Sequence, residues 1–163
     1  MNLNRSLKKG QSLIEVVVAL AVVSLLAVAL ISTSLVTQRT SKAAANDTQA
    51  TKLVQQNIEQ MRVFRDRKGY SALVDGTCYT LIIANVSDPN TWSIAACSGG
   101  TINGEVITQA NVVFTRRIAI ATPGGTSNQK RITVTVTWPD QGGTQTVSNV
   151  TILSNCISGA DSC

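Results

Sequence analysis

The feature that most constrains this chain is a stretch of 58 residues, 11–68, that contains neither glycine nor proline. Inside an α-helix, glycine costs about 1 kcal/mol and proline about 3 kcal/mol relative to alanine. A run this long without either residue predicts continuous helix. The chain has 163 residues, which leaves room for one small globular domain beyond that helix.

The predicted helix has two chemically different halves. The first, residues 11–36, is apolar nearly all round from Val16 onward and is long enough to cross a bilayer. The second, residues 37–68, is amphipathic. Its predicted buried stripe consists of Ala43, Ala50, Leu53, Val54, Asn57, Ile58, Met61 and Phe64. We expect this stripe to pack on a sheet and the helix to end at Gly69.

Short runs rich in β-branched residues follow the helix. The run 132–138 alternates strictly between apolar residues and threonine, as a strand with one buried face does. Turn residues at 123–125 and 139–143 predict an antiparallel meander. We predict strands at 78–84, 93–97, 112–121, 131–138 and 144–153, and loop or weakly ordered hairpin over 86–111. The fold class is therefore α+β, with a long N-terminal helix on a small antiparallel sheet and a globular β-domain over 69–163.

One acidic residue, Glu15, lies just inside the apolar segment. Among the sixteen residues that follow it, only Ser24 is polar. A carboxylate at membrane depth costs about 2.5 to 3.5 kcal/mol on insertion scales, and such groups are usually functional. The segment supplies no cation for Glu15, so its partner must come from elsewhere.

The net charge of +5 is concentrated at the N-terminus. Without residues 1–10 the chain keeps 11 basic and 9 acidic residues, a net charge of +2. The basic character is therefore weak support for a nucleic-acid partner. Under the positive-inside rule, Lys8 and Lys9 serve better as a cytoplasmic anchor, which places the following domain outside the cytoplasm.

All four cysteines follow the apolar segment, in the part that would be exported. They are Cys78, Cys97, Cys156 and Cys163. Disulfides are expected, but four cysteines allow three pairings and the sequence does not choose among them. We favour Cys78 with Cys97 and Cys156 with Cys163, because both pairs close short loops. Zinc is the alternative, although the chain has neither a Cys-x-x-Cys pair nor a histidine.

No catalytic arrangement is visible in the sequence. Histidine is absent, the nine acidic residues are scattered, and the paired glycines lack the Gly-Lys-Ser/Thr of a phosphate-binding loop. We therefore predict no enzyme, no cofactor and no metal site. The basic cluster Arg62, Arg65, Arg67 and Lys68 could contact DNA or an acidic surface, but a solvated helix end explains it better.

Three general interpretations of the N-terminus leave something unexplained. A cleaved secretory signal needs small residues just after its apolar core, whereas those at 27–29 and 43–45 lie inside the core or well beyond it. A plain membrane anchor gives no reason for Glu15. A buried helix of a soluble protein does not suit so long and uninterrupted an apolar surface.

The fourth interpretation uses every residue. The basic Lys8-Lys9, then Gly10, then Glu15 five positions later and the apolar helix together resemble the class III signal of type IV pilins and pseudopilins. The resemblance implies that a membrane prepilin peptidase removes residues 1–10 as a leader and N-methylates Gln11. It also implies a pilin-like α+β fold, a single pass through the cytoplasmic membrane with the domain outside, and assembly with other pilin subunits on a pilus assembly platform. The product would be an extracellular pilus or a periplasmic pseudopilus.

The resemblance also suggests a role for Glu15. The amine of Gln11 stays charged when methylated, and in staggered helices it can approach the Glu15 carboxylate of a neighbour. Each charge alone is costly in lipid and the pair is much less so, which favours polymerisation and fixes its register.

Two departures from the family pattern are present. The mature chain would begin with Gln11, where family members commonly have phenylalanine, and the apolar helix lacks the proline or glycine that often kinks it. The short domain favours a minor subunit, and the strand end 134–139 resembles minor pilins of the modification-protein group. We expect a minor pilin or pseudopilin, with a major pilin or a type II secretion pseudopilin as the nearest alternative. An alternative of another class is a membrane-anchored adhesin or DNA-binding surface module that uses the loops at 86–111.

Overall fold

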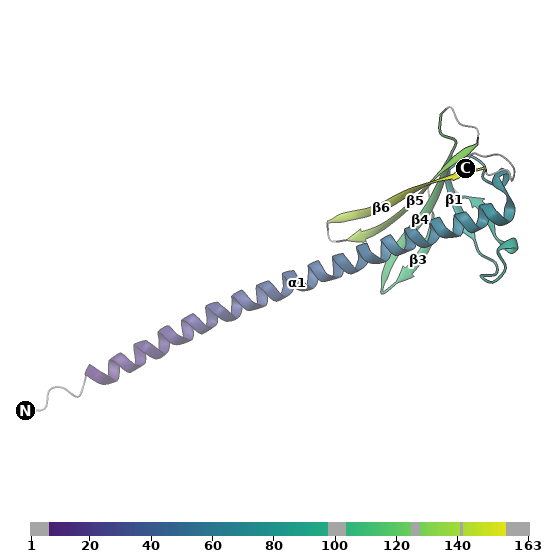
Figure 1. Cartoon of the computed structure of the whole chain (residues 1–163). Coiled ribbons are helices and arrows are strands. Elements are labelled where there is room, and N and C mark those ends of the chain that lie inside the picture. Colours follow the sequence, from purple (N-terminus) through teal and green to yellow (C-terminus); the bar gives the residue numbers. More distant parts are fainter. Residues whose placement is uncertain (1–6, 98–103, 125–127, 141, 156–163) are drawn as a thin grey trace, which may run out of the picture. The chain divides into compact units, whose positions relative to one another are not determined.

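A computed structural model of the chain describes residues 7–97, 104–124, 128–140 and 142–155, with side chains from residue 13 onward. It contains one long helix, α1 (Leu7–Lys68), and a six-stranded sheet (Figure 1). The chain divides into two compact units, residues 1–44 and 45–163. The first unit holds the apolar half of α1, and the second holds the rest of α1 and the whole sheet.

The helix α1 is unbroken for 62 residues and ends where the sequence predicts. It begins at Leu7, before the predicted start, and runs through Gly10, since one glycine costs only about 1 kcal/mol in a long helix. It ends at Lys68 because Gly69 has a φ of 86° and donates its N–H to the carbonyl of Arg65 at 2.8 Å. This left-handed glycine is the usual helix stop.

All pairings in the sheet are antiparallel. The strand order is β2-β1-β4-β5-β6, with β3 also paired to β4. The strands are β1 (Gly76–Ile82), β2 (Ser93–Ala96), β3 (Glu105–Gln109), β4 (Val112–Ala121), β5 (Gln129–Asp140) and β6 (Gly143–Ser154), and two short 3₁₀ helices are η1 (Tyr70–Ala72) and η2 (Pro89–Thr91). The predicted meander is confirmed as β4, β5 and β6.

The predicted turn over 139–143 is wrong for its first residues. Pro139 lies inside β5, opposite Thr144 of β6. The pairing of β5 with β4 ends at Thr137, opposite Thr115, so the proline lies beyond the part of β5 that has partners on both sides. A strand tolerates proline at such an edge position because no ladder hydrogen bond is lost there.

The region 86–111, predicted as loop or weakly ordered hairpin, contains the regular strand β3. This strand forms a hairpin with β4 in which Gln109 lies opposite Val112. The two loop residues, Ala110 and Asn111, both have positive φ, 48° and 65°, as a type I′ turn requires. Alanine rarely adopts this conformation. Such hairpins are usually predicted from an Asn-Gly pair, and the turn here has Ala-Asn instead.

The part of α1 that belongs to the second unit packs on one face of the sheet, as the stripe predicts. Every stripe residue from Ala50 to Phe64 is buried, whereas Ala43 belongs to the first unit. The buried residues of the long strands that belong to the same core are Phe114, Ile118, Ile120, Ile132, Val134, Val136, Trp138 and Leu153. The ring centroids of Phe114 and Trp138 are 5.9 Å apart. The predicted α+β architecture is therefore confirmed.

A polar cluster ties the segment after α1 to the sheet. The Oδ1 atom of Asp75 accepts a hydrogen bond from Lys130 Nζ at 2.5 Å. Its Oδ2 atom accepts from the hydroxyl of Thr122 at 2.8 Å and from the N–H of Thr122 at 3.2 Å. The bond from Lys130, followed by those from Thr122, lowers the pKa of Asp75.

The Asp75 cluster predicts a specific pH dependence of stability. Because the pKa is lower in the folded chain than in the unfolded one, the carboxylate stabilises the fold above the unfolded-state pKa of about 3.9. That contribution is lost as the pH falls through the folded-state pKa. Asp75→Asn is therefore expected to lower the free energy of unfolding near pH 7 and to have little effect near pH 2, in urea denaturation at both values. Equal effects at the two pH values would contradict this account.

Candidate assembly site

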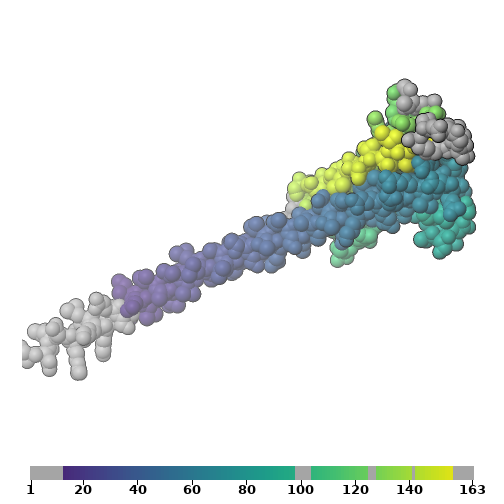
Figure 2. All heavy atoms as spheres, in the orientation of Figure 1, coloured from purple at the N-terminus to yellow at the C-terminus, as the bar shows by residue number. Residues whose placement is uncertain are grey.

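The apolar half of α1 exposes its side chains. Every described side chain from residue 13 to residue 42 is exposed, and Leu25 and Leu30 are 73% and 70% exposed. Figure 2 draws one face of this segment in purple to blue. Within the described residues, α1 is the one helix whose length and composition suit a membrane span. Full burial of a leucine side chain gains about 1.5 to 3 kcal/mol. This surface is therefore built to contact lipid or other apolar helices.

Hydroxyl groups in this half of α1 are satisfied by the helix itself. Ser24 donates to the carbonyl of Leu20 at 2.7 Å, and Ser32 donates to the carbonyl of Val28 at 2.9 Å. Thr33 makes the same kind of bond to the carbonyl of Ala29. Side chains bonded in this way need no partner from the surrounding medium.

Glu15 is different, because it carries the only charge between residues 13 and 38. Its side chain is exposed, and no hydrogen bond or ion pair reaches it from any described residue. An uncompensated carboxylate on an apolar helix is costly once that helix is buried. The structure therefore leaves Glu15 in need of a partner outside the described chain.

The predicted processing residues lie next to this site in the sequence. Lys8, Lys9, Gly10 and Gln11 are all within α1. Their side chains lie outside the described ones, so the geometry of the cleavage site stays a prediction.

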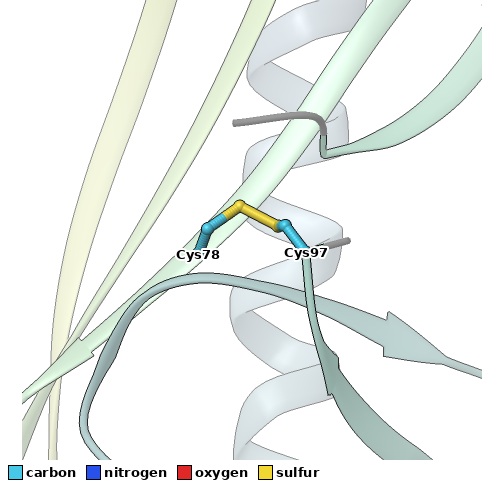
Figure 3. Close-up of a disulfide and its surroundings, with 2 residues drawn as sticks. All are labelled: Cys78 and Cys97. Carbon is cyan, nitrogen blue, oxygen red and sulfur yellow. A yellow bond between two sulfur atoms is a disulfide. The ribbon is translucent and has the colours of Figure 1, made fainter. Parts of the chain in front are cut away.

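One of the two favoured disulfides is confirmed. Cys78 and Cys97 are bonded, with their Cα atoms 5.4 Å apart (Figure 3), and the bond joins β1 to the end of β2. The loop between these strands is anchored by Trp92, whose Nε1 donates to the carbonyl of Asn85 at 2.6 Å. The predicted pair Cys156 and Cys163 lies outside the described residues. Within the described part of the chain, no group of three or more His, Cys, Asp or Glu could hold a metal ion.

The basic cluster at the end of α1 is partly neutralised by its own helix. Arg62 pairs with Glu59 and Arg65 pairs with Asp66, both with N–O distances of 2.7 Å. Arg65 also donates to the carbonyl of Ser154 at 3.5 Å. These contacts fit a helix end that faces solvent better than a surface prepared for DNA.

Sequence reasoning missed an ion pair on the sheet between a buried arginine and a partly exposed glutamate. Arg116 is only 5% exposed, and its Nε and Nη2 atoms donate to Glu105 Oε2 at 3.0 and 2.5 Å. The two residues lie opposite each other on β3 and β4. A Cβ on the neighbouring Gly104 would lie 2.1 Å from the Arg116 carbonyl oxygen, so only glycine fits there. The pair links β3 to β4, and it could not be predicted without β3.

Comparison with known families agrees with this geometry. Residues 5–31 match the family described as prokaryotic N-terminal methylation motif. The match includes Gly10, Gln11 and Glu15, together with most of the exposed apolar helix. The chain carries the type IV pilin signal. No curated protein and no solved structure matches it.

The pilin signal and the fold support one coarse conclusion. The matched motif, the long apolar helix and the pilin-like α+β architecture support a type IV pilin-like or pseudopilin subunit. Such subunits are structural proteins rather than enzymes, and the motif implies processing by a prepilin peptidase and assembly with other pilin subunits. An N-terminal apolar helix with this motif also fits membrane anchoring and a place in a pilus or pseudopilus.

Proposed function

We propose that this pilin-like chain is a minor pilin or pseudopilin whose apolar helix is built into the core of a filament. The leader, residues 1–10, is removed after Gly10, and the new amine of Gln11 is methylated. The observation that supports this most strongly is Glu15, a charge without a partner among the described residues on an exposed apolar helix.

The proposed assembly contact is an ion pair between neighbouring subunits. Cleavage creates a charged amine at Gln11, four residues before Glu15. In an array of parallel, staggered helices, that amine can meet the Glu15 carboxylate of the next subunit. Two charges that are costly alone then compensate each other, so the contact favours polymerisation and sets its register.

The rest of the chain takes separate roles in this proposal. The unbroken apolar half of α1 supplies packing area along the filament core, where close helix packing replaces lipid contacts. The β-domain lies on the outside, where an oxidising compartment maintains the bond between Cys78 and Cys97. Before assembly the same helix holds the precursor in the cytoplasmic membrane.

Substitution of Gly10 tests the processing step. Gly10→Asp is expected to block cleavage, because the pilin signal places the cut after this glycine. The uncleaved chain lacks a free amine at Gln11, so filament incorporation should fall below detection. Immunoblots of membrane and sheared filament fractions measure both effects.

Gly124→Asp is the matched control for that experiment. It makes the same replacement where a new Cβ would have no atom of the described residues within 4 Å, so processing and assembly should stay normal. Filaments that contain uncleaved Gly10→Asp chain would contradict the proposed pathway.

A further inference from the structure

A second carboxylate of α1, Asp47, has no partner among the described residues. Four acidic residues lie on α1, namely Glu15, Asp47, Glu59 and Asp66. Glu59 and Asp66 are each paired with an arginine of the same helix at 2.7 Å. Among the described residues, neither a hydrogen bond nor an ion pair engages Asp47, which is exposed. Glu15 and Asp47 are thus the two acidic residues of α1 for which no such contact is described.

A lysine that is also exposed and unpaired among the described residues lies five residues before Asp47. Lys42 is exposed and has no partner within the described part of the chain. Side chains five residues apart lie about 140° apart around an α-helix, whereas helix ion pairs form at spacings of three or four residues. Lys42 therefore cannot pair with Asp47 of its own helix, and the two charges remain available to different neighbours.

We propose that Asp47 of one subunit pairs with Lys42 of a neighbouring copy of this chain. The inference rests on the proposed filament function, because it uses the same stagger. Pairing Glu15 with a neighbour's Gln11 amine requires parallel helices offset by about four residues, roughly 6 Å at 1.5 Å per residue. That offset brings Asp47 level with residue 43 of the same neighbour, one position from Lys42. The flexible lysine side chain covers the remaining difference.

The proposed contact is head-to-tail, since each subunit offers its Asp47 to one neighbour and its Lys42 to another. Interfaces of this heterologous kind propagate into helical filaments. One ion pair thus marks the apolar end of the helix array and a second marks its polar part.

A charge-swap series tests this pairing. Asp47→Lys and Lys42→Asp each place like charges opposite one another, so each should reduce sheared filament roughly fivefold or more, given about 1 kcal/mol per exposed contact and many contacts per filament. The double variant Asp47→Lys with Lys42→Asp restores opposite charges and should return filament to near the wild-type amount.

Arg39→Asp provides the matched control. It makes the same change of charge as Lys42→Asp, but Arg39 lies eight residues before Asp47. This separation is twice the four-residue offset between neighbouring helices, so the neighbour's residue 39 is not level with Asp47. Combined with Asp47→Lys it should not restore assembly. Cleavage after Gly10 is measured in every variant, because normal processing shows that the changed charge near the membrane surface has not impaired insertion.

The outcomes separate this inference from the proposed function. If the single variants assemble as wild type, or the double variant assembles no better than they do, the Asp47–Lys42 contact is wrong. Loss of assembly in Glu15→Val would then still support the filament function. If Glu15→Val itself assembles normally, the filament register and everything inferred from it are wrong.

Discussion

Replacement of Glu15 by valine is expected to abolish filament incorporation while leaving cleavage after Gly10 intact. The substitution removes one partner of the proposed ion pair and leaves the Gln11 amine of the neighbour uncompensated among apolar helices. Breaking a buried pair in this way costs about 3 to 5 kcal/mol, which corresponds to at least about a hundredfold loss in a subunit contact. Quantification of the chain in sheared filaments and in membranes measures the effect.

Two further variants show whether the loss is specific to Glu15. Glu15→Asp keeps the charge and should retain part of the assembly. Glu59→Val removes a carboxylate from the same helix outside the apolar segment, where the ion pair with Arg62 is exposed and contributes about 0 to 1 kcal/mol. It should therefore assemble normally. A Glu15→Val chain that enters filaments as efficiently as Glu59→Val would show that the carboxylate does not set the register.

The second large effect is expected in the core of the β-domain. Phe114 is fully buried and lies against Trp138, with 5.9 Å between ring centroids. Phe114→Ala is expected to lower the free energy of unfolding by about 3 to 5 kcal/mol, through lost apolar burial and the cavity that remains. Small domains have only about 5 to 15 kcal/mol of stability, so much of the domain's stability would be lost. Urea denaturation of the purified full-length chain in detergent, followed by tryptophan fluorescence, measures this change.

Val113→Ala is the matched control for the core substitution. Val113 precedes Phe114 on β4 but is 45% exposed, so its truncation should cost well under half as much, since little burial is lost. Equal losses from the two substitutions would mean that the helix–sheet core does not hold the domain together.

Periodicity and turn chemistry account for what could be predicted from the sequence. The long stretch without glycine or proline predicted α1, and the spacing of its apolar residues identified the face that lies on the sheet. Strict alternation of apolar residues and threonine at 132–138 predicted β5 and its buried face. The region of β3 was predicted only as loop or weakly ordered hairpin, because the hairpin turn uses Ala110 in a left-handed conformation. The ion pair of Arg116 depends on that strand.

Contacts between distant segments could not be read from local patterns. Asp75 meets Lys130 across 55 residues of sequence, and no spacing rule specifies such a pair. The bond between Cys78 and Cys97 was favoured by loop length alone. The assembly site, by contrast, could be identified from the sequence. Glu15 is the one charge of its apolar segment, and no described residue forms a hydrogen bond or an ion pair with it.

The measurement that tests the central claim most directly is the intact mass and N-terminal sequence of this chain recovered from sheared filaments. The account predicts a chain that begins at Gln11, carries one added methyl group on its amine, and gains two hydrogens for each disulfide on reduction. A chain that begins at Met1, or one that is absent from filaments and present only in membranes, would contradict it.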